Sequence, residues 1–262
     1  MLNFCSLYSG SSGNCYFIES ENTKLLIDAG VSLKKIEEGL NSINILPSSL
    51  NGILVTHEHS DHIQSLGNLS KKFNLPVYAN KETFSAMPKQ TDKILEKNIK
   101  YINIDETFNI NDINIKPFSI PHDAANPCGF TFEHNNKKIC TATDIGHMTQ
   151  DILKNLEGSS FVLLESNYDP EVLKCSKYPY LLKTRIAGPN GHLSNSMAGK
   201  TINYLINNGL NYAMLGHLSK ESNFPELAYQ TVVDEIISNN TDLSKIQLSV
   251  ANRDHISKII NI

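Results

Sequence analysis

The sequence lacks any long apolar run. Among its 262 residues, no segment approaches the roughly 20 consecutive apolar residues that a helix needs to cross a bilayer. The first six residues also lack the basic stretch and the apolar stretch of a secretory signal peptide. We therefore expect a cytoplasmic protein that makes no membrane contact.

Cysteines are few and show no pairing pattern. Their number, five, is odd, and no CxxC spacing occurs, which argues against a disulfide framework and against a zinc knuckle. Cys15, Cys128 and Cys140 lie in apolar runs, so we expect them to be small core residues.

The sequence also has no excess of positive over negative charge. The net charge of −4 provides no overall basic field for nucleic acid, so any contact with DNA or RNA must depend on local charge. Hydrophobic content of 40% and charged content of 19% are ordinary for a globular protein. The length allows one large domain or two small ones, and we predict a single domain over residues 1–262.

Apolar periodicity and turn residues predict an α/β fold. Strands are expected at 2–7, 15–18, 24–27, 52–55, 77–79, 99–104, 108–120, 128–132, 137–143, 161–164, 212–215 and 246–250. Helices are expected at 32–40, 62–73, 82–87, 149–156, 194–207 and 225–238. Strand-rich halves that alternate with helices fit two sheets packed face to face under outer helices.

The segment 167–190 is the least regular part of the chain. Pro170, Pro179 and Pro189 are expected to interrupt any helix there. A connection of this length indicates either a functional lid or a flexible segment.

The stretch Thr56 to His62, with sequence THEHSDH, follows a short apolar run. Its three imidazoles and the Asp61 carboxylate suit divalent metals, and no thiolate favours a closed structural site. His57 and His59 point to the same side of an extended segment, so one metal can bind both. Asp61 and His62 follow a turn and more naturally serve a second metal. The alternative, histidines beside an ordinary surface turn, would require this pattern to arise by chance.

This HxHxDH pattern resembles the metallo-β-lactamase superfamily, which implies an αββα sandwich of two mixed sheets. The resemblance implies that Asp28 supports the metal loop, that His122 completes the first metal site, that Asp144 bridges two metals, and that His217 is the last ligand. Each of these residues follows an apolar run. Taken alone, Asp28 could be a strand-end turn residue and His217 a buried core imidazole.

The predicted centre therefore contains two divalent ions. His57, His59 and His122 are assigned to the first, Asp61, His62 and His217 to the second, and Asp144 to both. The ligands suit zinc, manganese or iron, with zinc or manganese favoured. A hydroxide shared by two such ions is a nucleophile at neutral pH, and Asp61 could help hold or deprotonate it. The superfamily contains several kinds of enzyme, so the fold alone does not give the substrate.

Glu165 and His192 extend the resemblance to the nuclease branch related to ribonuclease Z, in which a glutamate and a histidine act together in proton delivery. Cleavage of a phosphodiester expels an alkoxide, so a positioned imidazolium is useful as a general acid. A carboxylate would orient that imidazole and raise its pKa. We assign His192 as proton donor and Glu165 as its partner. Alternatively, His192 packs against the lid and Glu165 caps a helix that begins near Ser166.

Nearly the whole chain is similar to the YycJ family, also called WalJ or VicX. The similar segments are 9–15, 122–124, 165–167, 191–195 and 216–219. This resemblance implies a metal-dependent phosphodiesterase, described as a 5′ to 3′ DNA exonuclease with a proposed part in DNA mismatch repair.

Contacts with a nucleic-acid substrate are expected at five positions: Ser11, Asn14, Lys177, Arg185 and Asn195. The loop 9–14 is either a plain hairpin turn or a source of backbone amides near the metals. The cations of segment 167–190, interleaved with Tyr178 and Tyr180, could contact phosphates and stack bases, or could simply be solvated.

Two other functions remain open. A small-molecule thioester or lactone hydrolase would retain the metal centre but would not depend on His192, because its leaving group needs little protonation. A non-catalytic regulatory protein would bind metal for stability or act through a partner. The complete ligand set argues against the second alternative. The sequence does not indicate an oligomeric state.

Overall fold

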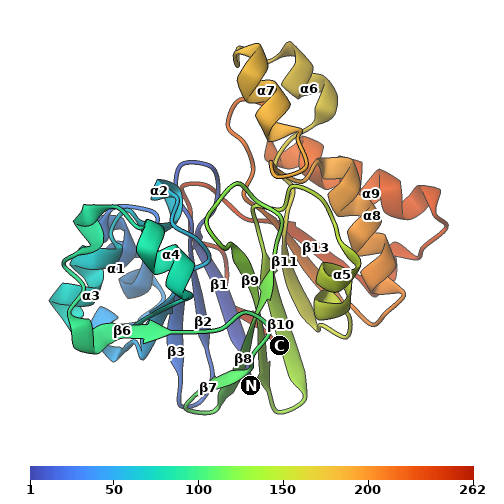
Figure 1. Cartoon of the computed structure of the whole chain (residues 1–262). Coiled ribbons are helices and arrows are strands. Elements are labelled where there is room, and N and C mark those ends of the chain that lie inside the picture. The colour runs from blue at the N-terminus through green and yellow to red at the C-terminus, as the bar shows by residue number, and fades with distance from the viewer.

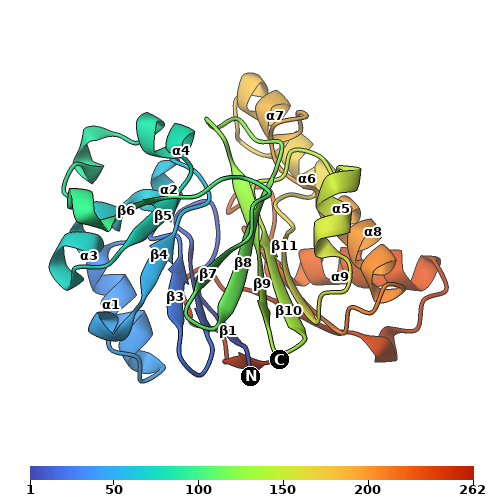
Figure 2. The same ribbon diagram turned by 60° about the horizontal axis from the view of Figure 1, so that its bottom comes forward.

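Two seven-stranded sheets pack face to face at the centre of the structure, and helices cover the outer face of each sheet (Figures 1 and 2). This is a computed structural model that describes the backbone of residues 1–262 and every side chain except that of Gln90. The four layers confirm the predicted αββα class.

The two sheets have the same arrangement of strands. The first has the order β14 (Ile260–Asn261), β1 (Asn3–Tyr8), β2 (Cys15–Glu19), β3 (Lys24–Ile27), β4 (Gly52–Leu54), β5 (Val77–Ala79) and β6 (Ile99–Tyr101). The second has the order β13 (Gln247–Val250), β12 (Tyr212–Gly216), β11 (Phe161–Glu165), β10 (Lys137–Ala142), β9 (Cys128–His134), β8 (Ile113–Ser119) and β7 (Phe108–Ile110). In each sheet an antiparallel half meets a parallel half, at β3 and at β10 respectively.

Helices form the two outer layers and one edge. The first sheet is covered by α1 (Leu33–Ser42), α3 (Leu66–Phe73) and α4 (Lys81–Ala86), and the second by α5 (Gln150–Leu156), α8 (Asn195–Ile206) and α9 (Pro225–Ser238). The remaining helices are α2 (Ser60–Ile63), α6 (Pro170–Cys175) and α7 (Tyr180–Ile186), and short 3₁₀ turns occur at Pro47–Ser49, Lys89–Thr91, Glu96–Asn98 and Leu243–Lys245. Figure 1 shows α6 and α7 projecting beyond the ends of the strands. No described helix is long and apolar enough to span a bilayer.

Local sequence explains where several of these elements begin and turn. Ser32 caps α1 by accepting a hydrogen bond from the Lys35 amide, and Thr149 caps α5 in the same way. The β9–β10 hairpin turns at Asn135 and Asn136, whose φ angles of +48° and +59° suit the tight turn that matches strand twist.

Three apolar layers hold the sandwich together. Phe4 and Phe161 meet between the sheets with ring centroids 4.6 Å apart, and other clusters lie under the outer helices. Complete burial of such a side chain contributes roughly 1.5–3 kcal/mol. Cys15, Cys128 and Cys140 are fully buried, as predicted for small core residues.

Three expectations from the sequence were wrong in detail. The helix expected at 62–73 is divided into α2 and α3, because the Ser65 amide donates to the Ala29 carbonyl instead of continuing the helix. The strand expected at 108–120 is a hairpin, β7–β8, that turns at Asn111 with φ +48°. The short terminal strand β14 was not predicted.

The segment 167–190 was also predicted incorrectly as irregular. It contains two helices, α6 and α7; two of its prolines lie at the starts of these helices, and Pro189 follows the end of α7, so none interrupts a helix. Pro170 occupies the first turn of α6 and Pro179 immediately precedes α7. These positions need no backbone amide donor, so proline is tolerated there.

Candidate active site

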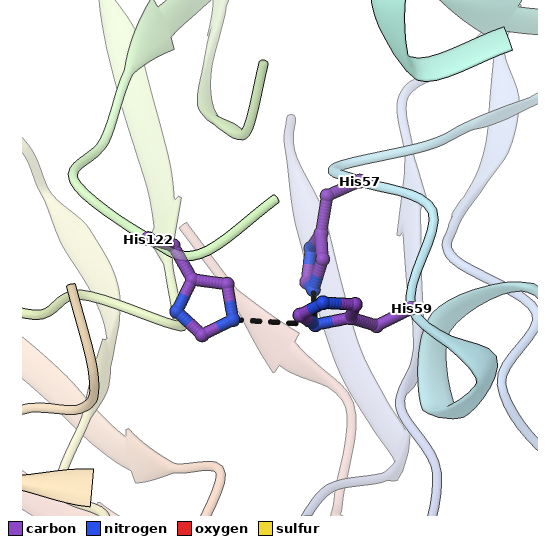
Figure 3. Close-up of side chains that lie close together, drawn as sticks. All are labelled: His57, His59 and His122. Atoms are coloured by element: carbon purple, nitrogen blue, oxygen red, sulfur yellow. Dashed lines mark hydrogen bonds between the residues drawn. The ribbon is translucent and has the colours of Figure 1, made fainter. Parts of the chain in front are cut away.

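Three histidines from two loops converge at the edge of the sandwich. His57 and His59 follow β4, and His122 follows β8. His59 Nδ1 lies 3.1 Å from His57 Nε2 and 3.3 Å from His122 Nε2, and Figure 3 shows the three rings turned toward one another. These nitrogens are arranged to bind one cation.

A second group lies beside the first. Asp61 Oδ2 is 3.6 Å from His62 Nε2 and 3.5 Å from His217 Nε2, and His62 Nε2 is 3.3 Å from Asp144 Oδ2. Asp144 Oδ1 lies 3.7 Å from His122 Nε2 of the first group. Asp144 therefore stands between the two groups, in the position expected of a bridging carboxylate.

Hydrogen bonds on the side of the rings away from the centre fix the loop that follows β4. Asp28 accepts from both the amide and the hydroxyl of Thr56, each at 2.9 Å, and its Oδ2 lies 2.7 Å from His62 Nδ1. His57 Nδ1 lies 3.0 Å from the Thr56 hydroxyl. Because Nδ1 of His57 and of His62 is occupied, the Nε2 atoms of these two rings face the centre, and such partners set ring orientation and basicity in metal sites.

The later histidines are fixed in the same way. His122 Nδ1 lies 3.0 Å from the Gly191 carbonyl, and His217 Nδ1 lies 2.7 Å from Glu165 Oε1. The His217 amide donates to the Ser9 hydroxyl at 2.9 Å, which ties this strand end to the loop after β1.

Three side chains of the site are on residues with a left-handed backbone conformation, which sets the direction of each side chain. Asp28, Asp144 and His217 end β3, β10 and β12 and have φ angles of +61°, +61° and +55°. Non-glycine residues seldom adopt this region, and strained backbone occurs preferentially at functional sites. The turn at each strand end directs the side chain across the edge of the sheet.

Glu165 links a further histidine to the centre. Its Oε1 lies 2.9 Å from His192 Nδ1, and its Oε2 accepts from the amides of Ile145 at 2.7 Å and Leu193 at 2.9 Å. Glu165 is fully buried, whereas the His192 side chain is 15% exposed. No helix begins at Ser166, so Glu165 does not cap one, and it contacts both His192 and His217.

Burial and nearby opposite charges shift the pKa values of the site's histidines and aspartates in opposite directions. Burial alone would lower the pKa of His62, but nearby carboxylates, Asp144 foremost, raise it to about 9. The pKa of His217 is raised against its burial in the same way. Burial would raise the pKa of Asp61 and Asp144, yet the imidazoles of His62 and His217 lower both. The carboxylates are therefore ionised, and cations would replace protons on these two histidines.

The residues present fit divalent cations. Four overlapping groups place their ligand atoms within 4.8 Å of one another: His57, His59 and His122; His57, His62 and Asp144; Asp61, His62 and His217; and Asp144, Glu165, His192 and His217. Asp144 Oδ2 and His217 Nε2 are buried and have no hydrogen-bond partner among the described groups. Buried polar atoms of this kind normally require a partner, and a cation would provide one.

The candidate substrate residues divide into two sets. Ser11 and Lys177 are exposed. Asn14 and Asn195 are fully buried and hydrogen-bonded within the protein, so their assignment as substrate contacts stays a prediction. Asn14 Oδ1 accepts from the Gly10 amide and its side-chain nitrogen lies 3.2 Å from His62 Nε2, while Asn195 bonds to Ser166 and to Asn223.

Arg185 lies close to the centre, as its prediction as a substrate contact requires. Its Nε and Nη2 donate to the two carboxylate oxygens of Asp123 at 2.5 and 3.1 Å. Asp123 directly follows His122, and the Arg185 side chain is 51% exposed. The guanidinium is therefore held beside the predicted metal ligands and still faces solvent.

Asp28 was predicted from the sequence to support the metal loop, but three other groups that orient the ligands were not predicted. Thr56, Ser9 and the Gly191 carbonyl contact His57, His217 and His122 respectively. Thr56 was visible as the first residue of the metal motif, whereas a backbone carbonyl carries no signal in the sequence.

Comparisons with known proteins agree with this geometry. A model of the beta-lactamase superfamily domain matches residues 23–212. The exodeoxyribonuclease WalJ of Streptococcus pneumoniae is 38% identical over 232 residues, covering 88% of this chain and 86% of the relative. The exodeoxyribonuclease YycJ of Bacillus anthracis is 36% identical over 231 residues, covering 88% of each. Among solved structures, the metallo-β-lactamase fold protein YhfI of Bacillus subtilis superposes with a TM-score of 0.71 at 16% identity, covering 98% of both chains.

The sandwich and its histidine and aspartate cluster define a metal-dependent hydrolase of the metallo-β-lactamase fold. Within this superfamily, the chain belongs to the family of the WalJ and YycJ proteins.

Proposed function

We propose that this protein is a dinuclear metal-dependent phosphodiesterase that degrades DNA as a 5′ to 3′ exonuclease. The names of the two relatives support the nuclease activity. The observation that carries the proposal is the imidazole of His192, fixed by a buried carboxylate beside the predicted metal ligands. A part in mismatch repair stays a prediction.

Seven side chains would hold two cations, zinc or manganese in our proposal. His57, His59 and His122 would bind the first cation, Asp61, His62 and His217 the second, and Asp144 both. Bound divalent ions would lower the pKa of water and neutralise charge on the attacked phosphate.

The residues of the chain would carry the proton transfers. Asp61, whose side chain is 24% exposed, would help hold or deprotonate the attacking water. His192 would give a proton from Nε2 to the departing oxygen, because Glu165 occupies Nδ1. Glu165 would act as a positioning residue for both His192 and His217.

The direct test is a nuclease assay with single-stranded and double-stranded DNA and RNA, labelled at either the 5′ or the 3′ end. It is repeated after chelation and after replacement with zinc or manganese. We expect mononucleotides to be released from the 5′ end of DNA only with metal present. A holo-protein that leaves every DNA substrate intact, yet hydrolyses members of a thioester panel, would refute the proposal in favour of the small-molecule hydrolase.

A variant pair isolates the proton donor. His192→Ala should retain its metal content and lose about 10²–10⁴-fold in turnover, the usual contribution of a general acid. His255→Ala, which removes an exposed histidine of the C-terminal segment, is the matched control. Equal turnover in the two variants would remove His192 from the mechanism.

A further inference from the structure

The projecting helices α6 and α7 enclose an apolar pocket of about 510 Å³. Its lining includes Tyr168, Leu173 and Tyr180, together with the aliphatic stems of Lys174 and Lys183. Its volume falls in the range of roughly 300–1,000 Å³ typical of pockets for small organic ligands. Tyr168 and Leu173 are buried, but Tyr180 is 79% exposed, so one wall is an aromatic ring open to solvent.

The charge of this part of the chain differs from that of the rest. Segment 167–190 carries four cations, Lys174, Lys177, Lys183 and Arg185, against the carboxylates Asp169 and Glu171. Its net charge is therefore +2 in a chain whose total is −4, which leaves −6 for the remainder. A positive segment on a negative protein attracts an anion specifically to this place.

Backbone hydrogen bonds join the wall of the pocket to the candidate active site. The Asn195 amide donates to the Tyr168 carbonyl at 2.9 Å, and the Asn167 amide donates to the Leu193 carbonyl at 2.8 Å. The inner wall of the pocket is thus hydrogen-bonded to the loop that carries His192. The outer helix, α7, carries Arg185, whose guanidinium is fixed beside His122 through Asp123.

We propose that this pocket binds an unpaired nucleobase of a single-stranded DNA substrate, an inference that rests on the proposed function. The base would stack on Tyr180 beside Lys174 and Lys183, while the cations of segment 167–190 would contact the flanking phosphates. Aromatic stacking accepts any base, because every base has a flat face. The pocket would thus hold the strand in place without selecting a sequence.

The absence of tryptophan from the sequence permits a direct binding test. Tyr180→Trp introduces a single tryptophan at the pocket, which can be excited selectively over the tyrosines, and Tyr101→Trp places one at a similarly exposed tyrosine on β6, which is 65% exposed. Phosphorothioate-linked single-stranded DNA is titrated into each holo-protein. We expect saturable quenching in the first variant only, and none with an abasic oligonucleotide of equal length.

Other occupants would give different results. Equal quenching by abasic and base-containing oligonucleotides would show phosphate contact without base binding and would overturn the proposal. An emission shift that grows with protein concentration without DNA would show that a second copy fills the pocket, which would also overturn it.

Kinetics provides the second measurement. Tyr180→Ala should raise KM for single-stranded DNA about tenfold, the size of one lost stacking contact, and Tyr180→Phe should restore it. Tyr101→Ala should leave KM unchanged.

If the wild-type protein degrades DNA but Tyr180→Ala has an unaltered KM, the pocket proposal fails and the proposed function stands. If the wild-type protein degrades no DNA yet Tyr180→Trp is quenched by it, the proposed function fails and the pocket proposal stands.

Discussion

Replacement of Glu165 by glutamine tests the connection between the proton donor and the metal centre. The carboxylate accepts hydrogen bonds at both oxygens, from two imidazoles at Oε1 and from two backbone amides at Oε2. Glutamine has the same shape but offers only one accepting oxygen, and its amide nitrogen can only donate. Either orientation of the amide therefore disrupts one pair of bonds.

The structure indicates which loss to expect. If the amide nitrogen takes the place of Oε2, it faces the Ile145 and Leu193 amides, and each buried donor left without a partner costs about 1–3 kcal/mol. If it takes the place of Oε1, both imidazoles must accept at Nδ1 and carry their proton on Nε2. His217 then cannot bind a metal through Nε2, the atom that faces Asp61. Loss of such an orienting partner typically weakens metal binding 10–100-fold.

The second orientation should prevail, because it leaves no buried amide donor without an acceptor. Metal affinity and turnover should therefore fall together in Glu165→Gln, whereas His192→Ala should affect turnover alone. Zinc competition titrations, metal content by mass spectrometry and initial rates on labelled DNA measure the two effects. Glu171→Gln, at an exposed position on α6, is the control for the loss of one negative charge. Wild-type zinc affinity in a folded Glu165→Gln protein would refute the shared role of this carboxylate.

Three further predictions concern the centre and its edge. Asp28→Asn should lower zinc affinity 10–100-fold in competition titrations, because the single oxygen of asparagine cannot accept from both the Thr56 amide, which bonds to Oδ1, and the His62 ring, which bonds to Oδ2; unchanged affinity would contradict this role. In the metal-free protein the pKa of His62 is raised from 6.5 to about 9, so its contribution to stability is complete below pH 6.5 and is lost as the pH rises through 9. Zinc binding at pH 7.5 should accordingly release at least one proton, which calorimetry in buffers of different ionisation enthalpy would detect, and chelation should lower the melting temperature. Arg185→Ala should reduce by about 1 the slope of log binding constant against log salt for DNA, and an unchanged slope would remove Arg185 from the phosphate contacts.

The fold could be predicted where the sequence signal is local. β3, β5 and α9 lie at the predicted positions, because turn residues or proline bound their apolar patterns clearly. The division between α2 and α3 could not be predicted, because it depends on a hydrogen bond from Ser65 to Ala29, which is distant in the sequence. The turn at Asn111 had a local signal, because asparagine favours turns. The alternation of apolar and polar residues on both sides of it nevertheless led to the prediction of one continuous strand.

The clustering of the candidate ligands could be predicted for a similar reason. His57, His122, Asp144 and His217 each come within three residues of the end of an apolar strand, a pattern that is visible in the sequence alone. Burial of Asn14 and Asn195 could not be read in the same way, because both lie in polar motifs that appear solvent-facing until loops from elsewhere cover them. The contact between Arg185 and Asp123 joins residues 62 positions apart, and no local pattern connects them.

Both sheets have the same arrangement of strands, and this explains why residues that follow the ends of strands form the candidate metal site. Asp28 ends β3 and Asp144 ends β10, the strands at which the antiparallel half of each sheet meets its parallel half, and both have φ +61°. The next parallel strand in each sheet, β4 or β11, leads to the histidine motif or to Glu165. Ligands in open α/β sheets bind beyond the carboxyl ends of strands, at points where the strand order changes. Because two such points face each other across the sandwich, each sheet contributes part of the candidate centre, and neither half contains it alone.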